Sequence, residues 1–143
     1  MKFWDASAIL PLCVTEVHTL TLRKLTEEDS ALVAWWGTPL ECYSAMARLR
    51  RDGFLSSAGE EEARRVLSLL AGEWTEIAPS HDVREEAGRL LYFHPLRAAD
   101  ALQLAAALLW ARKNPRGEGF ICLDSRLREA ARREGFTLLP VEV

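Results

Sequence analysis

One stretch of the sequence constrains the fold more than any other. From Ala98 to Trp110 the only polar residues are Asp100 and Gln103. A helix that is apolar nearly all round is buried among other elements. Pro95 is predicted to take the first helical position, where its missing N–H does no harm. The stretch therefore predicts a buried central helix that carries one carboxylate, Asp100.

Asp100 raises the question of what neutralises its charge. Burying an unpaired carboxylate is so costly that the group must be protonated, paired or bound to a metal ion. A partly buried ion pair with Arg97, earlier on the same predicted helix, is one answer. The other answer is that Asp100 shares a site with polar groups from elsewhere in the chain.

Length, charge and cysteine content limit what such a chain can be. A chain of 143 residues is expected to form a single domain over residues 1–143. A formal net charge of −3 argues against nonspecific duplex binding, which usually needs a basic domain. No apolar run is long enough to cross a bilayer, and no signal peptide pattern is recognised. Cys13, Cys42 and Cys122 match neither a disulfide framework nor a zinc site, so a reducing cytoplasm is the expected location.

Strands and helices are predicted to alternate along the chain. Residues 31–36 form a continuous apolar run typical of a buried parallel strand. Further strands are expected at residues 2–4, 76–78, 119–123 and 136–139. Helices are expected at residues 5–12, 19–28, 38–51, 57–70, 80–93, 95–110 and 125–134. The alternation predicts an α/β fold of three layers, in which helices flank a central, mostly parallel sheet.

Four carboxylates fall near predicted helix starts. Asp5 and Asp124 each follow a strand and precede a helix, and Glu41 begins the helix after another strand. Each has a local interpretation: Asp5 and Asp124 as N-caps, and Glu41 as the capping-box partner of an N-cap at Thr38. In open α/β sheets, however, ligands bind outside the carboxyl ends of the strands. Asp5, Glu41, Asp100 and Asp124 are therefore predicted to converge at that edge.

Converging carboxylates favour a divalent cation. Like charges repel one another, and a cation removes the repulsion. Oxygen ligands without histidine or cysteine select Mg²⁺ or Mn²⁺ over zinc. Such an ion is commonly held by one or two carboxylates together with substrate phosphates. The matching reaction is metal-assisted hydrolysis of a phosphodiester bond.

Four segments of the sequence carry a resemblance to a known family. They are residues 3–10, residues 39–41, residues 96–105 with the run Leu-Arg-Ala-Ala-Asp-Ala-Leu-Gln-Leu-Ala, and residues 121–127 with the run Ile-Cys-Leu-Asp-Ser-Arg-Leu. In order and spacing the chain resembles the PIN-domain ribonucleases, and among them the VapC toxins of bacterial and archaeal toxin–antitoxin pairs. The resemblance covers essentially the whole chain, and its central segment is the most specific part.

The resemblance implies an endoribonuclease that depends on Mg²⁺ or Mn²⁺. Asp5 and Asp100 match the principal metal ligands, and Asp124 and Glu41 match the acidic positions that complete the site or hold its waters. Ser7 matches a hydroxyl residue that hydrogen-bonds near Asp5. Family members usually form homodimers and are inhibited by a cognate antitoxin. RNA, an antitoxin and a second copy of the chain are therefore the partners that the resemblance implies.

Several other residues are weaker candidates. Cys122 departs from the family pattern, because many relatives have threonine at this position. Trp35 and Trp36 are expected in the strand core rather than as a platform on which RNA bases stack. Five basic residues around the strand at 119–123 are candidates for phosphate contacts or for a solvated surface: Arg112, Lys113, Arg116, Arg126 and Arg128.

Two other classes of function stay open. A non-catalytic module on a PIN-like fold would bind RNA or protein, and the absence of Mn²⁺ binding would favour it. A phosphoryl-transfer or receiver-like domain also has an acidic pocket. That domain would want a lysine or a phosphorylatable aspartate at the pocket, and Lys2, Lys24 and Lys113 are poorly placed for such a role.

Overall fold

The five strands form one parallel sheet. A computed structural model describes residues 1–143. Neighbouring strands all pair in parallel, and the strand order is β3-β2-β1-β4-β5. The strands are β1 (Lys2–Trp4), β2 (Leu32–Trp35), β3 (Thr75–Ile77), β4 (Gly119–Ile121) and β5 (Thr137–Leu139). The predicted α/β architecture is confirmed.

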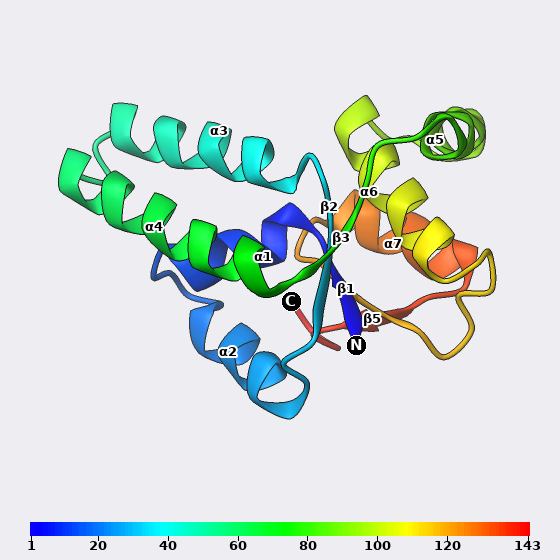
Figure 1. The fold of residues 1–143 in the computed structure, drawn as a ribbon, viewed down its shortest axis with the longest axis horizontal. Helices are drawn as coiled ribbons and strands as arrows, with labels where there is room; N and C mark the ends of the chain where they lie inside the picture. Colours follow the sequence, from blue (N-terminus) through cyan, green and yellow to red (C-terminus); the bar gives the residue numbers. More distant parts are fainter.

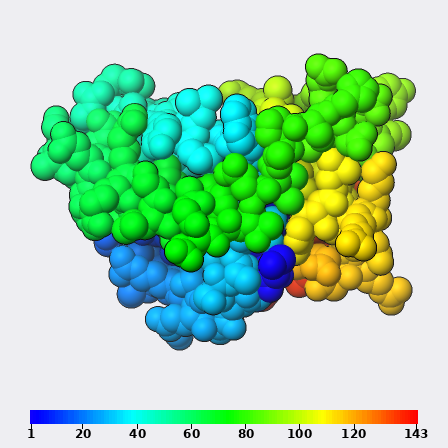
Figure 2. Space-filling model, viewed as in Figure 1, coloured from blue at the N-terminus to red at the C-terminus, as the bar shows by residue number.

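Helices cover both faces of the sheet (Figure 1). One layer contains α1 (Ala6–Cys13), α2 (Thr19–Glu28), α3 (Thr38–Arg51) and α4 (Ser57–Glu73). The other layer contains α5 (His81–Phe93), α6 (Ala98–Trp110) and α7 (Ser125–Glu134). The hairpin of α3 and α4 projects beyond the sheet on the left of Figures 1 and 2. No helix is both long enough and apolar enough to cross a membrane.

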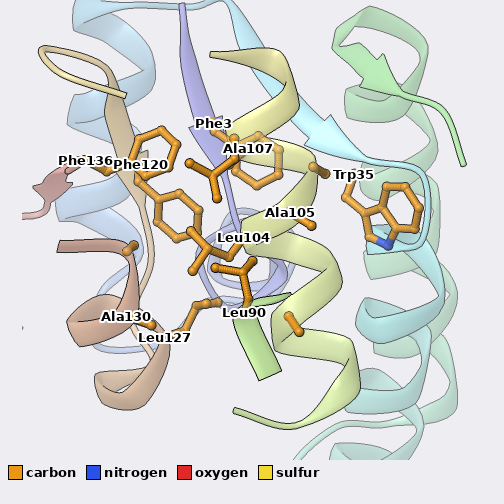
Figure 3. Packing of buried hydrophobic residues seen from close by; sticks show 14 of the residues in the cluster. Phe3, Trp35, Leu90, Leu104, Ala105, Ala107, Phe120, Leu127, Ala130 and Phe136 are labelled. Atoms are coloured by element: carbon orange, nitrogen blue, oxygen red, sulfur yellow. The ribbon is translucent and has the colours of Figure 1, made fainter. Parts of the chain in front are cut away.

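The buried side chains form two clusters, one under each helix layer. Successive residues of a strand point to opposite faces, so Phe3 joins the cluster of α5, α6 and α7, whereas Trp4 joins that of α1, α3 and α4. The rings of Phe3 and Phe120 stack with their centroids 5.4 Å apart, and Leu104 of α6 packs in the same cluster (Figure 3). Leu104 and its neighbours through Ala107 are fully buried, so the prediction of a central helix is confirmed.

The strand order reverses at β1. The chain passes from β1 through β2 to β3, and then crosses to the other side of β1 to form β4 and β5. Such a switch point leaves a crevice outside the carboxyl ends of the two strands that flank it, which is the usual ligand position in open α/β sheets. Asp5 directly follows β1, and Asp124 follows β4. The topology therefore brings these two carboxylates to the same edge of the sheet, at the switch point.

The predicted start of α6 is wrong. The helix begins at Ala98 with Arg97 as its N-cap, so Pro95 is not its first residue. Pro95 instead follows His94, the C-cap of α5. Proline is common just after a helix end because it cannot continue the helix. As a consequence, Asp100 lies in the first turn of α6 rather than deeper in it.

The predicted capping of α3 and the position of one tryptophan also need correction. Gly37 is the N-cap of α3, and Thr38 lies inside the helix, where its side chain is fully buried. Trp35 is buried as expected, but Trp36 is 57% exposed. The strand ends at Trp35, so Trp36 leaves the sheet before its ring can be covered.

Candidate active site

Asp5 is fixed by the end of β1 and the start of α1. Its backbone N–H donates to the Ile121 carbonyl at 2.9 Å, and its side chain caps α1 by accepting from the Ser7 N–H at 3.1 Å. The Ser7 hydroxyl donates to the same oxygen, Asp5 Oδ2, at 2.5 Å, and the Cys122 thiol lies 3.5 Å from it. Burial raises the pKa of Asp5, and the hydrogen bonds from Ser7 and Cys122 offset part of that rise.

Asp124 has the same local role at the neighbouring strand but a different environment. Its Oδ2 accepts from the Leu127 N–H at 2.9 Å and so caps α7. Asp124 is exposed to solvent, whereas Asp5 is only 3% exposed. The local interpretations of both residues as N-caps are confirmed. They do not exclude a functional role, because each cap uses Oδ2 and leaves Oδ1 free of these bonds.

Asp100 is half-buried in the first turn of α6. Burial, followed by the carboxylates of Asp124 and Asp5, raises its pKa to about 6. Arg97 and Arg126 are near enough to lower the pKa of Asp100. Neither guanidinium approaches within ion-pair distance, so the Asp100–Arg97 ion pair considered from the sequence does not form.

Glu41 reaches the site from α3. Its Oε2 accepts from Gln103 Nε2 at 2.7 Å, and the same nitrogen donates to Thr38 Oγ1 at 3.0 Å. The predicted capping box between Thr38 and Glu41 is therefore wrong, because Gln103 engages both side chains. The pKa of Glu41 is raised to about 7: burial is the main cause, the bond from Gln103 lowers the pKa, and the carboxylates of Asp5 and Asp100 raise it.

All four carboxylates lie at the carboxyl edge of the parallel sheet, where the hydrogen bonds from Gln103 also join α6 to the first turn of α3. The pKa of Asp100 responds to Asp5 and Asp124, and the pKa of Glu41 responds to Asp5 and Asp100. Like charges that lie near one another in a partly desolvated site disfavour ionisation, which agrees with the direction of both shifts. Asp5 comes from the end of β1, Glu41 from α3, Asp100 from α6 and Asp124 from the start of α7.

Three of these carboxylates are held through one oxygen each. The bonds described above reach Asp5 Oδ2, Asp124 Oδ2 and Glu41 Oε2, and none of them reaches the second oxygen. A carboxylate that is oriented through one oxygen can use the other to bind a cation or to position water. The arrangement therefore combines fixed geometry with free acceptor oxygens.

The donor set fits a hydrated divalent cation. No group of three or more histidine, cysteine, aspartate or glutamate side chains is placed to hold a metal ion directly. Mg²⁺ does not need such a cage, because it keeps several waters and binds through one or two carboxylates plus substrate phosphates. The raised pKa values of Asp5, Glu41 and Asp100 mean that the charged forms are disfavoured, which a cation would relieve.

Some of the basic residues predicted as phosphate contacts have no ion-pair or hydrogen-bond partner in the protein, and others have one. Arg126 lies at the start of α7 and acts electrostatically on Asp100, as does Arg97, the N-cap of α6. Arg128 is not available for RNA, because it donates to the backbone carbonyls of Cys122 at 2.8 Å and Pro140 at 2.9 Å. Lys113 lies 3.9 Å from Glu86 in an ion pair.

Gln103 is the residue that reasoning from the sequence missed. It is fully buried, and its Oε1 has no hydrogen-bond partner. The signal was visible as the one amide in a helix that is otherwise apolar apart from Asp100. The role of this amide depends on the packing of α3 against α6, which the sequence does not show.

Comparison with known proteins shows similarity to proteins that are named as ribonucleases and toxins. No family model matches the chain. Ribonuclease VapC45 and Ribonuclease VapC49, both from Mycobacterium tuberculosis, are each 29% identical over 144 residues, which cover 100% of this chain and 97% of theirs. Among solved structures, VapC20 of Mycobacterium tuberculosis, a Sarcin-Ricin loop cleaving toxin, has a TM-score of 0.68 at 17% identity and covers 96% of this chain and 97% of its own. The chain is similar to VapC ribonucleases and has their PIN fold.

Two further solved structures have the same architecture. A toxin–antitoxin complex from Klebsiella pneumoniae has a TM-score of 0.68 at 17% identity, with full coverage, 100% of each chain. FitAcB from Neisseria gonorrhoeae has a TM-score of 0.63 at 15% identity and covers 96% of each chain. At such identities the likeness establishes the fold alone.

Proposed function

We propose that the chain is an endoribonuclease that hydrolyses RNA phosphodiester bonds with Mg²⁺ or Mn²⁺, and that it is the toxin of a toxin–antitoxin pair. One observation carries the proposal: Asp5, Glu41, Asp100 and Asp124 lie at the ends of strands or in the first turns of helices at the switch-point edge of a PIN fold. The likeness to proteins named Ribonuclease VapC45 and Ribonuclease VapC49 supports it.

In this proposal the carboxylates divide the work of holding a cation. Asp5 and Asp100 are the principal ligands, and Asp124 completes the site through a bound water. The cation, when bound, supplies an activated water and stabilises charge on the phosphoryl oxygens. Ser7 orients Asp5 by donating to its Oδ2, so that Oδ1 is left for the ligand. No side-chain nucleophile is needed.

Glu41 is proposed as the proton acceptor of the reaction. The buried Glu41 carboxylate lies at the edge where the cation is proposed to bind, and a carboxylate within reach of the attacking water can accept its proton. The Gln103 amide holds Glu41 Oε2, and this leaves Oε1 for the water. Glu41 would thus act as the general base, and no histidine is needed.

Two free arginines are proposed to bind the RNA backbone. A purely acidic pocket would repel RNA, and Arg97 and Arg126 lie at its rim without carboxylate partners. Phosphate contacts from arginine position a nucleic acid without reading its sequence. Arg97→Ala and Arg126→Ala should each raise KM, leave kcat little changed and reduce the slope of log affinity against log salt by about one. Arg23→Ala on α2, far from the crevice, is the matched control and should change neither quantity.

The direct test of the function is RNA cleavage by the purified protein. Total RNA is incubated with the protein in EDTA, in Mg²⁺ and in Mn²⁺, and the cleaved ends are mapped by sequencing. We expect cleavage with either metal, none in EDTA and none with Asp100→Asn. The alternative, a non-catalytic RNA- or protein-binding module, would show no cleavage and no Mn²⁺ binding at millimolar concentration by calorimetry.

An antitoxin and a second copy of the chain are the proposed protein partners. An apolar groove of about 520 Å³ lies beside the crevice, and its lining includes Ser7, Leu10, Pro11, Val14, Leu49 and Phe54. An apolar antitoxin segment in this groove would reach the rim of the site. Co-expression with the neighbouring reading frame should give an inactive complex, and Phe54→Asp should release active nuclease from it.

Light scattering tests the proposed homodimer, and fractionation tests the proposed cytoplasmic location.

A further inference from the structure

Gln103 is a buried amide at the boundary between the two helix layers. Its side chain is fully buried on α6, in the layer of α5, α6 and α7. Its Nε2 donates across to Thr38 Oγ1 at 3.0 Å and Glu41 Oε2 at 2.7 Å, both on α3 in the opposite layer. The amide therefore links the first turn of α3 to the middle of α6 at the end of the sheet where the carboxylates lie.

Packing alone does not account for an amide at this position. Gln103 Oε1 is buried without a hydrogen-bond partner. Leaving a buried acceptor unsatisfied is destabilising, whereas methionine or leucine would fill similar space without that cost. The neighbouring residues Leu104, Ala105 and Ala106 are all apolar and fully buried. The amide is better explained by the group to which it donates.

We propose that Gln103 is a positioning residue of the nuclease site, which holds the Glu41 carboxylate toward Asp5 and Asp100 while Thr38 holds the amide. This inference rests on the proposed function, because it assigns Gln103 a part in that reaction. Thr38 is fully buried and cannot move aside, so its hydroxyl fixes one N–H of the amide and directs the other to Glu41. Without this bond the flexible Glu41 side chain would sample several rotamers.

The loss of a positioning bond should appear in kcat rather than in KM. Small misplacement of a reacting group lowers the rate of the chemical step, while the RNA is bound by other side chains. Gln103→Met should therefore lower kcat by about 10- to 100-fold, the range typical of residues that orient a ligand or base. Leu104→Met is the matched control, since Leu104 is equally buried on the same helix and packs in the apolar cluster of α5, α6 and α7. It should leave kcat unchanged even where it lowers thermal stability.

A double-mutant cycle separates positioning from a general effect on the fold. If Gln103 acts through Glu41, then Gln103→Met should have no further effect on kcat in a Glu41→Ala background. A merely structural role predicts the opposite, namely that the two losses multiply. Thr38→Val provides a second route if Gln103→Met does not fold. It removes one acceptor of the amide and should lower kcat by a few-fold, again only when Glu41 is present.

The composition of the chain offers a spectroscopic test that needs no substrate. Gln103 and Asn114 are the only residues with side-chain amides, so a ¹⁵N correlation spectrum contains two NH₂ pairs. Asn114 is exposed, which makes it an internal reference. The Gln103 pair should exchange slowly with water, should shift on titration with Mg²⁺ and should move in the Glu41→Ala variant. The exposed Asn114 pair should exchange quickly with water. Its peaks should not move in the Mg²⁺ titration or in the Glu41→Ala variant.

The outcomes distinguish this inference from the proposed function. If the wild-type protein and Mg²⁺ cut no RNA, the nuclease assignment is wrong. If Glu41→Ala is inactive while Gln103→Met cuts at the wild-type rate, the nuclease assignment stands and the positioning role is overturned. Multiplicative losses in the cycle, or a Gln103 NH₂ pair unchanged in Glu41→Ala, would overturn it as well.

Discussion

The two polar residues of α6 lie one turn apart and occupy opposite environments. Asp100 is half-buried in the first turn and has free carboxylate oxygens. Gln103 is fully buried and donates to Thr38 and Glu41. The charged group thus stays near solvent and near the helix N-terminus, which favours a carboxylate, whereas the neutral amide enters the core.

This difference indicates how a charged site can be built on a buried helix. A carboxylate at the rim stays accessible to a cation, while an amide in the core can orient a neighbouring carboxylate without adding charge. A carboxylate at position 103 would be buried, and an amide at position 100 could not neutralise a cation. Substitutions that remove or exchange the two groups therefore separate their contributions.

Removing the charge of Asp100 is expected to have the largest effect. Asp100→Asn should lower kcat on the order of 10³-fold, because losing a metal ligand removes several kcal/mol of transition-state stabilisation and about 1.4 kcal/mol is tenfold in rate. The metal-free variant should be at least as stable as the wild type, since one repelling carboxylate is gone. Single-turnover cleavage and thermal unfolding measure the two effects, and a variant that cuts at the wild-type rate would refute the mechanism.

Placing a charge at the position of Gln103 should mainly affect stability. Gln103→Glu keeps the shape of the side chain but puts a second carboxylate beside Glu41 in a fully buried position. We expect the free energy of unfolding at neutral pH to fall by about 3 kcal/mol, as is typical of an uncompensated buried charge. Mild acid should reverse much of the loss as the new carboxyl becomes neutral. Urea unfolding against Gln103→Met tests this, and equal stability of the two variants at neutral pH would contradict it.

Ser7 stands in the same relation to Asp5 as Gln103 does to Glu41. Its hydroxyl donates to Asp5 Oδ2 at 2.5 Å and accepts from the Leu123 N–H at 2.9 Å. Ser7→Ala should weaken Mg²⁺ activation by about tenfold, since the loss of an orienting bond is at the low end of such effects. Ser68→Ala, on the exposed surface of α4, is the control and should be neutral. An unchanged Mg²⁺ requirement in Ser7→Ala would argue that α1 alone orients Asp5.

The smallest expected effect is a pH dependence of stability without metal. The pKa of Asp100 is raised from 3.8 to about 6 and that of Glu41 from 4.5 to about 7, so between these values the folded protein binds more protons than the unfolded chain. Stability is therefore greatest in mild acid and is lost as the pH rises through about 6 to 7. The Tm in EDTA should fall by a few degrees from mildly acidic to mildly alkaline buffer, and Mg²⁺ should flatten the curve. A Tm that rises with pH in EDTA would contradict this.

Much of the fold follows from local pattern. The strand at residues 2–4 and the helices Thr19–Glu28 and Ser125–Glu134 have the predicted bounds, because alternation, periodicity and capping residues are short-range signals. One helix start and one cap assignment are wrong where local signals compete. Pro95 is equally suited to end one helix or begin the next, and Thr38 has the residue type of a cap although a buried amide engages its hydroxyl. A single domain over residues 1–143 stays a prediction.

The sequence by itself determined which side chains are present at the strand and helix ends: Asp5 after β1, Asp124 after β4 and Asp100 on an apolar helix. Such positions depend on residues next to one another in the chain. Only the tertiary structure decided that Glu41 and Gln103, 62 residues apart, share a hydrogen bond, and that Asp100 stays at the rim while Gln103 is enclosed. Those outcomes depend on how α3 and α6 pack across the end of the sheet, and no local pattern encodes the distance between elements that meet only when the chain has folded.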